Sequence, residues 1–337
     1  MDLWVTFIGT AASVPTAGRG TSATLVVRGG SRVLIDCGEG TQRQFLRSGL
    51  GLVDLDAILL THLHGDHYLG LPGLLKTYGL RGRTTALPLI GPPGLHALLA
   101  ALGPVIGRLP FALEVREVEH GPVLGLEGAH WEAFATQHSV RSVGYALIEE
   151  ARPGMFDLAA ARALGVPAGP LFGQLQRGET IAIDGVVVSP DQVLGEARAG
   201  RRVVVTGDTE PCDATREAAD RAELLVHEAT FLDEDRARAR ETHHSTAREA
   251  GAVARDADVR LLALTHVSSR FLPREVRKEA ESQFPATIVP RDFDQVEIPF
   301  AERGAPIFHP GGATRRPPEA DPPAAAGPGT VTERPHL

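Results

Sequence analysis

The residues from Thr61 to His67 concentrate groups that bind metal ions. The segment reads THLHGDH and places three histidines and one aspartate within six positions: His62, His64, Asp66 and His67. Imidazole nitrogens and carboxylate oxygens are ligands of zinc and similar divalent ions. Gly65 permits a sharp turn, so that side chains on both sides of it can converge. A polar loop whose histidines only face water is the alternative, but four ligands packed into one short segment favour a metal site.

Strand ends are expected to position these groups. The apolar run 57–60 directly precedes the metal-binding segment and predicts a buried strand that ends in a loop. Four later strands predicted from apolar runs also end in a histidine or a carboxylate: His138 after 131–136, Asp208 after 202–205, His227 and Glu228 after 224–226, and His266 after 261–264. We therefore expect these groups to meet at one place in the fold.

Asp36 ends one more expected strand, 32–36. Its carboxylate can orient a metal-bound histidine by accepting a hydrogen bond from the ring. It can also cap the helix expected after Gly40. The two roles are compatible, and the sequence favours neither.

The whole chain has the composition of a globular protein. Its 337 residues can bury a large core, as one large domain or two small ones, and no apolar run is long enough to span a bilayer. The first residues lack the basic region of a signal peptide, and two cysteines, Cys37 and Cys212, fit a reducing cytoplasm. The net charge of −8 argues against a uniformly basic nucleic-acid binder but allows a local basic patch.

The remaining elements frame an insertion and a tail. Helices are expected over 68–79 and 94–102, and further strands over 3–8, 23–28, 87–91, 111–118, 287–289 and 295–299. Between 149 and 200 the sequence becomes rich in Gly and Pro, which predicts either an idle surface excursion or a recognition arm. No periodicity is expected beyond about Arg303, and residues 311–337 are predicted to be a disordered Pro/Ala/Gly-rich tail.

The HxHxDH pattern of residues 62–67 resembles the signature of the metallo-β-lactamase fold. The resemblance implies an α/β protein built as an αββα sandwich, with a one- or two-metal site at one edge of the sheets. This fold supports many reactions, so it does not by itself name the substrate.

Further motifs closely resemble those of the ribonuclease Z family, over roughly residues 3–300. They are EGTQRQ at 39–44, HEAT at 227–230, HST at 244–246 and the Gly-Pro-rich segment around 169–171. The resemblance implies a nuclease domain over 1–310, with an inserted exosite arm at about 150–185. It also implies a zinc-dependent endoribonuclease that removes 3′ trailers from precursor tRNA by metal-hydroxide attack and leaves a tRNA 3′-OH. A cytoplasmic homodimer without membrane attachment is expected.

The same resemblance implies a role for each site residue. Two zinc ions per chain are expected, one held by His62, His64 and His138, the other by Asp66, His67 and His266, with Asp208 bridging them. Asp66 would also orient the attacking hydroxide and accept its proton. His244 would be the general acid, oriented by Glu228. Helix capping is the alternative role of His244, but Ser245 or Thr246 suits it better. His227 and His243 are expected to be structural.

Four arginines are candidates for substrate binding. Arg270 follows a predicted metal ligand and can clamp a phosphate, although a role as a salt-bridge partner is also open. Arg152 and Arg177, together with Arg162, are the cations expected to hold tRNA on the arm. The competing hypotheses are a hydrolase of small phosphodiesters or sulfate esters, which would not need the arm, and a noncatalytic binding protein. The intact ligand set argues against the second.

Overall fold

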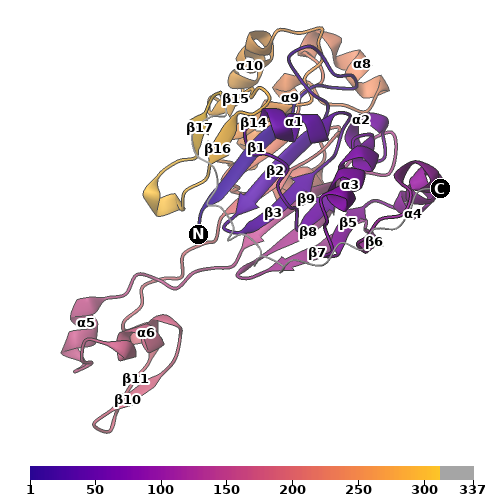
Figure 1. Ribbon diagram of the computed structural model, residues 1–337. Helices are drawn as coiled ribbons and strands as arrows, with labels where there is room; N and C mark the ends of the chain where they lie inside the picture. The colour runs from indigo at the N-terminus through magenta and orange to yellow at the C-terminus, as the bar shows by residue number, and fades with distance from the viewer. Residues whose placement is uncertain (312–337) are drawn as a thin grey trace, which may run out of the picture.

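Two β-sheets pack face to face in the computed structural model, which describes residues 1–311 (Figure 1). The first sheet has the order β17-β16-β1-β2-β3-β4-β5-β6. Its strands are β1 Leu3–Gly9, β2 Ala23–Arg28, β3 Ser31–Ile35, β4 Ala57–Leu59, β5 Leu87–Gly91, β6 Leu113–Glu117, β16 Gln295–Glu297 and β17 Ile307–His309.

The second sheet has the order β15-β14-β13-β12-β9-β8-β7. Its strands are β7 Gly121–Leu126, β8 Ala129–Ala135, β9 Val143–Glu149, β12 Arg202–Val205, β13 Leu224–Glu228, β14 Leu262–Thr265 and β15 Thr287–Ile288. Strands β12 to β15 run parallel to one another, whereas β9 is antiparallel to β12. The carboxyl ends of β12, β13 and β14 therefore lie at one edge of this sheet.

Helices cover the outer face of each sheet, because the strands are apolar on both sides. In β2, Val26 points into the cluster between the sheets, while Leu25 and Val27 join the cluster under the helices. The first sheet is covered by α1 Thr41–Arg47, α3 Leu71–Leu80 and α4 Leu95–Ile106, with the short α2 Gly65–Tyr68 beside them. The second is covered by α7 Asp213–Ala218, α8 Arg236–Glu241, α9 Ala247–Asp256 and α10 Pro273–Glu281.

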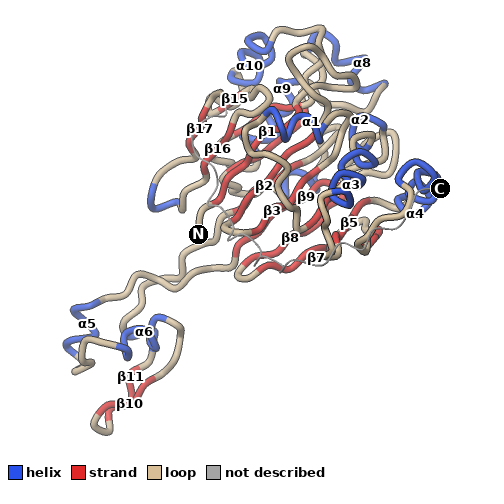
Figure 2. Tube along the Cα trace, viewed as in Figure 1, coloured by secondary structure: helices blue, strands red, loops and turns tan. Residues whose placement is uncertain are grey.

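An arm leaves the second sheet after β9 and returns at β12, so it is inserted between two strands that pair with each other. Two extended segments form its stem, and a small head lies at the far end (Figures 1 and 2). The head contains α5 Leu158–Ala163, α6 Pro170–Gln176, β10 Ile181–Ile183, β11 Val186–Val188 and the 3-10 turn η1 Pro190–Gln192. It has an apolar core of its own, built on Ala161, Leu175 and Val188.

The structure corrects several expected boundaries. The helix expected over 68–79 is interrupted between α2 and α3, because the Gly70 N–H donates to the Cys37 carbonyl oxygen at 2.9 Å instead of to a helical carbonyl. The expected helix over 94–102 continues to Ile106. The expectation of no regular structure beyond Arg303 is wrong for β17, which pairs with β16. The insertion extends past residue 185 to residue 201, because β10, β11 and η1 complete its head before the chain returns.

Two further sequence expectations concern membrane spans and the C-terminal tail. Within residues 1–311, no helix has the length and apolar character needed to cross a membrane. The predicted disordered tail, apart from its first residue, lies outside the described residues. Cys37 and Cys212 are free thiols.

Candidate metal centre and catalytic site

The predicted metal ligands converge at one edge of the two sheets. The loop after β4 and helix α2 supply His62, His64, Asp66 and His67 from the first sheet. The second sheet supplies the other three from the segments that follow β8, β12 and β14: His138, Asp208 and His266. The ligands therefore come from loops that are far apart in sequence, and the packing of the sheets brings them together.

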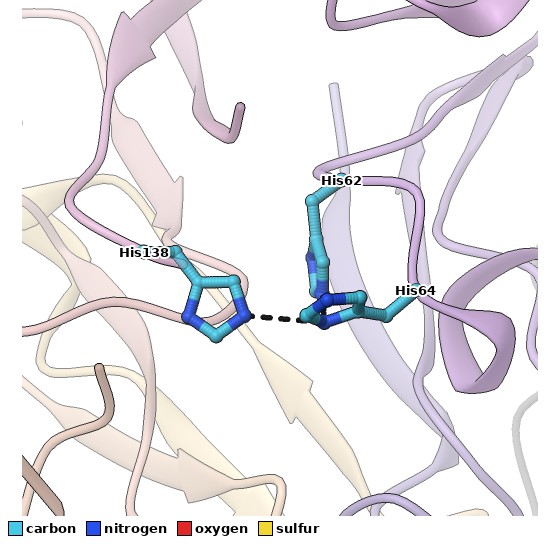
Figure 3. Close-up of side chains that lie close together, drawn as sticks. All are labelled: His62, His64 and His138. Atoms are coloured by element: carbon cyan, nitrogen blue, oxygen red, sulfur yellow. Dashed lines mark hydrogen bonds between the residues drawn. The ribbon is translucent and has the colours of Figure 1, made fainter. Parts of the chain in front are cut away.

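The first predicted set consists of three histidines that face one another (Figure 3). The Nδ1 atom of His64 lies 3.1 Å from Nε2 of His62 and 3.2 Å from Nε2 of His138. His62 is fully buried, and burial lowers the pKa of its ring well below the ordinary value. A neutral ring keeps a lone pair available for a metal ion.

The second predicted set surrounds Asp66. Its Oδ2 atom lies 3.2 Å from Nε2 of His266 and 3.5 Å from Nε2 of His67. The backbone N–H of Ser13 donates to the same oxygen at 2.9 Å. The loop after β1 therefore helps to orient Asp66.

Asp208 lies between the two sets. Its Oδ2 atom is 3.7 Å from Nε2 of His62, 3.5 Å from Nε2 of His67 and 3.4 Å from Nε2 of His266. Burial alone would raise the pKa of this carboxyl, but the neighbouring His266 and His67 hold it well below its ordinary value. A charged carboxylate in this place can bridge two cations.

Orphaned polar atoms show that these residues fit metal ions. The Oδ1 atom of Asp208 and the Nε2 atom of His67 are buried and have no hydrogen-bond partner. Leaving such atoms unpaired costs about 1–3 kcal/mol each, and a cation between them would remove that cost. The set of histidine nitrogens and carboxylate oxygens suits divalent ions such as zinc.

The outer nitrogen of three of these rings has a fixed oxygen partner. The Nδ1 atoms of His67, His138 and His266 contact Asp36 Oδ2 at 2.7 Å, the His243 carbonyl oxygen at 2.8 Å and Thr230 Oγ1 at 2.9 Å. Each contact directs Nε2 of the same ring toward the centre. Asp36 thus makes the histidine contact that the first of its two predicted roles requires. It does not cap α1, whose N-cap is Gly40 and has no side-chain cap.

Glu228 and His244 form a pair beside the metal ligands. Nδ1 of His244 lies 2.7 Å from Oε1 of Glu228, and the buried carboxylate also accepts from the backbone N–H groups of Thr209 and Thr230. Burial alone would lower the pKa of His244, but the Glu228 carboxylate raises it to about 9. His244 therefore carries a proton at neutral pH. Thr246 caps α9, as expected, and leaves the His244 ring for another task.

Thr230 is a site residue to which the sequence assigned no role. Its hydroxyl donates to Oε2 of Glu228 at 2.6 Å and accepts from Nδ1 of His266 at 2.9 Å. It therefore joins the Glu228–His244 pair to His266, a predicted metal ligand. The HEAT motif contains this threonine, but the motif alone does not reveal the contact with His266, which lies 36 residues away.

The remaining two histidines differ in position. His227 is buried, its Nδ1 contacts the carbonyl of Glu228, and it belongs to none of the donor groups among the described residues. The ring of His243 pairs with Glu210 at 2.6 Å, while the backbone carbonyl of His243 accepts the hydrogen bond from Nδ1 of His138.

Three of the four candidate substrate-binding arginines, Arg270, Arg177 and Arg152, have a carboxylate partner. Arg270 contacts Asp235 at 2.6 Å, Arg177 contacts Glu179 at 2.8 Å, and Arg152 makes a two-point contact with Glu302. The arm is also not basic: residues 153–197 contain two arginines and five acidic residues. Electrostatic attraction alone therefore does not make the arm a tRNA-binding surface.

The two facing sheets, the outer helices and the ligand cluster at their edge define a metallo-β-lactamase fold. Residues 16–146 match the model of the metallo-beta-lactamase superfamily. The chain is 48% identical over 308 residues to ribonuclease Z of Haloferax volcanii, covering 90% of this chain and 97% of that protein. It is 45% identical over 305 residues to ribonuclease Z of Myxococcus xanthus, covering 89% and 99%. The chain belongs to the ribonuclease Z family.

Solved structures agree with this assignment. The crystal structure of the short form of human tRNase Z has a TM-score of 0.64 and 26% sequence identity, covering 88% of this chain and 99% of that chain. The metallo-beta-lactamase fold protein YhfI of Bacillus subtilis has the same TM-score at 21% identity, covering 88% and 100%, and shows the shared fold.

Proposed function

We propose that this protein is a zinc-dependent endoribonuclease that removes 3′ trailers from precursor tRNA and leaves a tRNA 3′-OH. The observation that carries the proposal is the placement of the His244–Glu228 pair beside a set of seven potential metal ligands, in a chain of the ribonuclease Z family. A nuclease of this kind needs a site for cations at the phosphate and a proton donor for the leaving oxygen.

The ligand residues divide into two sets around Asp208. We assign His62, His64 and His138 to one zinc ion, Asp66, His67 and His266 to the other, and Asp208 to both. When bound, two zinc ions would activate a water molecule at neutral pH and neutralise charge on the phosphate. Asp66 is held by Ser13 and His266, so its carboxylate is oriented to accept the proton of the attacking water.

The leaving ribose 3′ oxygen also needs a proton. His244 holds one, and Glu228 fixes the orientation of its ring through Nδ1. Nε2 of His244 is then the atom that donates the proton to the leaving oxygen. This division of work, in which a carboxylate orients a histidine that transfers the proton, is common to many hydrolases.

The arm, a homodimeric state and a cytoplasmic location remain part of this proposal. The arm projects from the body as a separate head on a stem, which suits contact with a part of the tRNA far from the scissile bond (Figure 1). Its head must bind through groups other than a dense set of cations, since acidic residues outnumber the arginines there.

A second candidate function is hydrolysis of small phosphodiesters or sulfate esters. The observation that favours it is the acidic arm, which lacks an evident electrostatic attraction for RNA. Such a hydrolase would use the same ligands and the same proton donor, but would have no use for a projecting arm.

One assay separates the two functions. Purified protein is incubated with precursor tRNA bearing a 3′ trailer, with and without an encoded CCA, and in parallel with bis(p-nitrophenyl) phosphate and an aryl sulfate. We expect cleavage at the 3′ end of the tRNA body, giving a 3′-OH. Hydrolysis of a small ester by a protein that leaves every tRNA precursor intact would overturn the proposed function.

A further inference from the structure

Glu302 joins both segments of the arm's stem to the body of the protein. It lies in the 3-10 turn η3 Ala301–Arg303, in the loop between β16 and β17 of the first sheet. Arg152 of the outgoing stem segment contacts its two carboxylate oxygens at 2.9 and 3.0 Å, and Arg198 of the returning segment contacts one of them at 3.1 Å. Among the described residues, these are the ion pairs that link residues 150–200 to the rest of the chain.

Phe300 extends the same contact into the core. Its ring centroid lies 3.5 Å from Cζ of Arg152 and 4.0 Å from Cζ of Arg201, so two guanidinium groups contact one ring. Arg201 is buried and makes hydrogen bonds to Glu149, at 2.7 and 2.8 Å, and to the carbonyl oxygen of Ile298 at 2.8 Å. The base of the stem is thereby connected to β9 and to the end of β16.

The stem beyond this contact is a paired ribbon. Arg152 and Arg198 exchange backbone hydrogen bonds of 2.8 and 2.9 Å, and Gly195 N–H donates to the Met155 carbonyl at 2.9 Å. The two segments approach so closely at Gly154 that a Cβ atom there would lie 2.0 Å from the Gly195 carbonyl oxygen. Because the ribbon is paired and the head has its own core, the direction of the head is set at the base.

A small rotation at the base becomes a large displacement at the head. The stem segment 152–157 is about 20 Å long at roughly 3.3 Å per extended residue, so a rotation of about 10° moves its far end by about 3–4 Å. The contact at the base therefore affects the binding of any substrate that touches both the head and the metal centre, because it sets the position of the head.

We propose that Phe300 and Glu302 form a clasp that fixes the direction of the arm, and thereby determines how tightly a long RNA substrate is held across the arm and the metal centre. The proposal rests on the proposed function and names two positioning residues for it. Arg152 is then a part of the clasp, which differs from the substrate contact expected from the sequence.

The first test compares two substrates. Phe300→Ala combined with Glu302→Gln is expected to raise KM for precursor tRNA about tenfold, the effect of about 1.4 kcal/mol, with kcat nearly unchanged. Hydrolysis of bis(p-nitrophenyl) phosphate should keep its wild-type rate, because that substrate does not reach the arm. Glu302→Asp keeps the carboxylate that Glu302→Gln removes, so it should retain part of the affinity for precursor tRNA. The matched control is Glu281→Gln, which breaks the exposed Arg277 ion pair on α10, outside the arm and the site, and should leave KM unchanged.

The second test measures the arm directly and requires no activity. Spin labels on cysteines replacing the exposed Val187 of β11 and Leu80 of α3, in a Cys212→Ser background, report the distance from head to body. We expect a narrow distance distribution that broadens or shifts in the Phe300/Glu302 double variant and not in Glu281→Gln.

The outcomes separate the clasp from the function. An unchanged distance distribution, or an unchanged KM alongside a broadened distribution, would overturn the clasp. Failure of the wild-type protein to cut any tRNA precursor would overturn the proposed function instead, and the distance measurement would still decide whether Phe300 and Glu302 hold the arm.

Discussion

The Nδ1 atom of His138 donates a hydrogen bond of 2.8 Å to the backbone carbonyl of His243. His243 directly precedes His244 and has a left-handed backbone with φ of 57°. The loop that carries the proposed proton donor therefore also orients a proposed zinc ligand. A change in the backbone of this loop would disturb both functions, whereas a change in the His243 side chain alone should not.

Asp208→Ala should remove the shared ligand of both metal sites. Elemental analysis of gently purified wild-type protein should approach two zinc equivalents per chain, and the variant should lose occupancy at both sites. Asp233→Ala, at a half-buried aspartate that pairs with Arg236 and Arg248 outside the ligand cluster, provides a control that should keep both ions. Retention of two zinc ions by Asp208→Ala would contradict the bridging assignment.

His244→Ala should bind zinc and precursor tRNA nearly normally while the cleavage rate falls by about 10²–10⁴-fold, the usual effect of a general acid. Glu228→Ala should lower the rate through the same step, so the double variant should be less than additive. His243→Asn is the matched control, because asparagine tolerates the left-handed backbone and keeps the carbonyl that serves His138. Loss of zinc from His244→Ala would show that His244 is a ligand.

Thr230→Val should weaken zinc binding and cleavage together. The valine keeps the shape of the side chain but removes both the donor to Glu228 and the acceptor for His266. Loss of such an outer hydrogen bond to a ligand histidine reduces metal affinity or activity about 10–100-fold. Thr230→Ser retains the hydroxyl and should behave like the wild type. A zinc titration with a competing chelator and a measurement of the cleavage rate test the two effects. If Thr230→Val has the zinc affinity and cleavage rate of the wild type, the proposed role of Thr230 between Glu228 and His266 is excluded.

Replacement of residues 153–197 by a short Gly-Ser turn should abolish tRNA binding and processing. The cut lies beyond the Arg152–Arg198 backbone pair, so the base of the stem and its contact with Glu302 can persist. Hydrolysis of bis(p-nitrophenyl) phosphate should survive, because the metal ligands belong to other loops. Gel-shift and cleavage assays give the result. Normal tRNA processing by the shortened protein would place recognition elsewhere, with Arg43 and Arg270 as the next candidates.

Glu149 should contribute stability that is lost in acid. Burial alone would raise the pKa of its carboxyl, but hydrogen bonds from Arg201 and Arg28 lower it to about 2. A carboxyl with a depressed pKa stabilises the fold above its unfolded value of about 4.3, by about 3 kcal/mol here, and loses that contribution as the pH falls toward 2. In urea unfolding, the difference in the free energy of unfolding between wild type and Glu149→Gln should become smaller from about pH 5 to about pH 2.5. A difference independent of pH would contradict the ion-pair explanation.

The strands that end in ligands were predictable because each is an apolar run that stops at a histidine or an aspartate. The run 57–60 before His62 and the run 202–205 before Asp208 show this directly. These side chains must leave the core where the strand ends, so their convergence at one sheet edge follows from the two-sheet fold. The α9 cap was predictable for a similar local reason, since Thr246 and Glu249 have the spacing of a capping box.

Contacts between distant segments were not predictable in this way. Strand β17 has only three residues and depends on its pairing with β16, so no alternation marks it in the sequence. Glu302 lies 150 residues from Arg152, and nothing in either segment signals the other. The role of Thr230 depends in the same way on where β14 places His266.

The order in which the proposed ligands occur along the chain determines when the site can form during synthesis at the ribosome. His62 emerges early, but His266 follows it by 204 residues. At roughly 5–20 residues per second, the ribosome needs about 10–40 s to add that length. During that interval the proposed set of Asp66, His67 and His266 lacks one member, and the other proposed set is complete only after His138 and Asp208 have been added. A nascent chain released before His266 would therefore be without a complete site, so partial translation products should not act as stray nucleases.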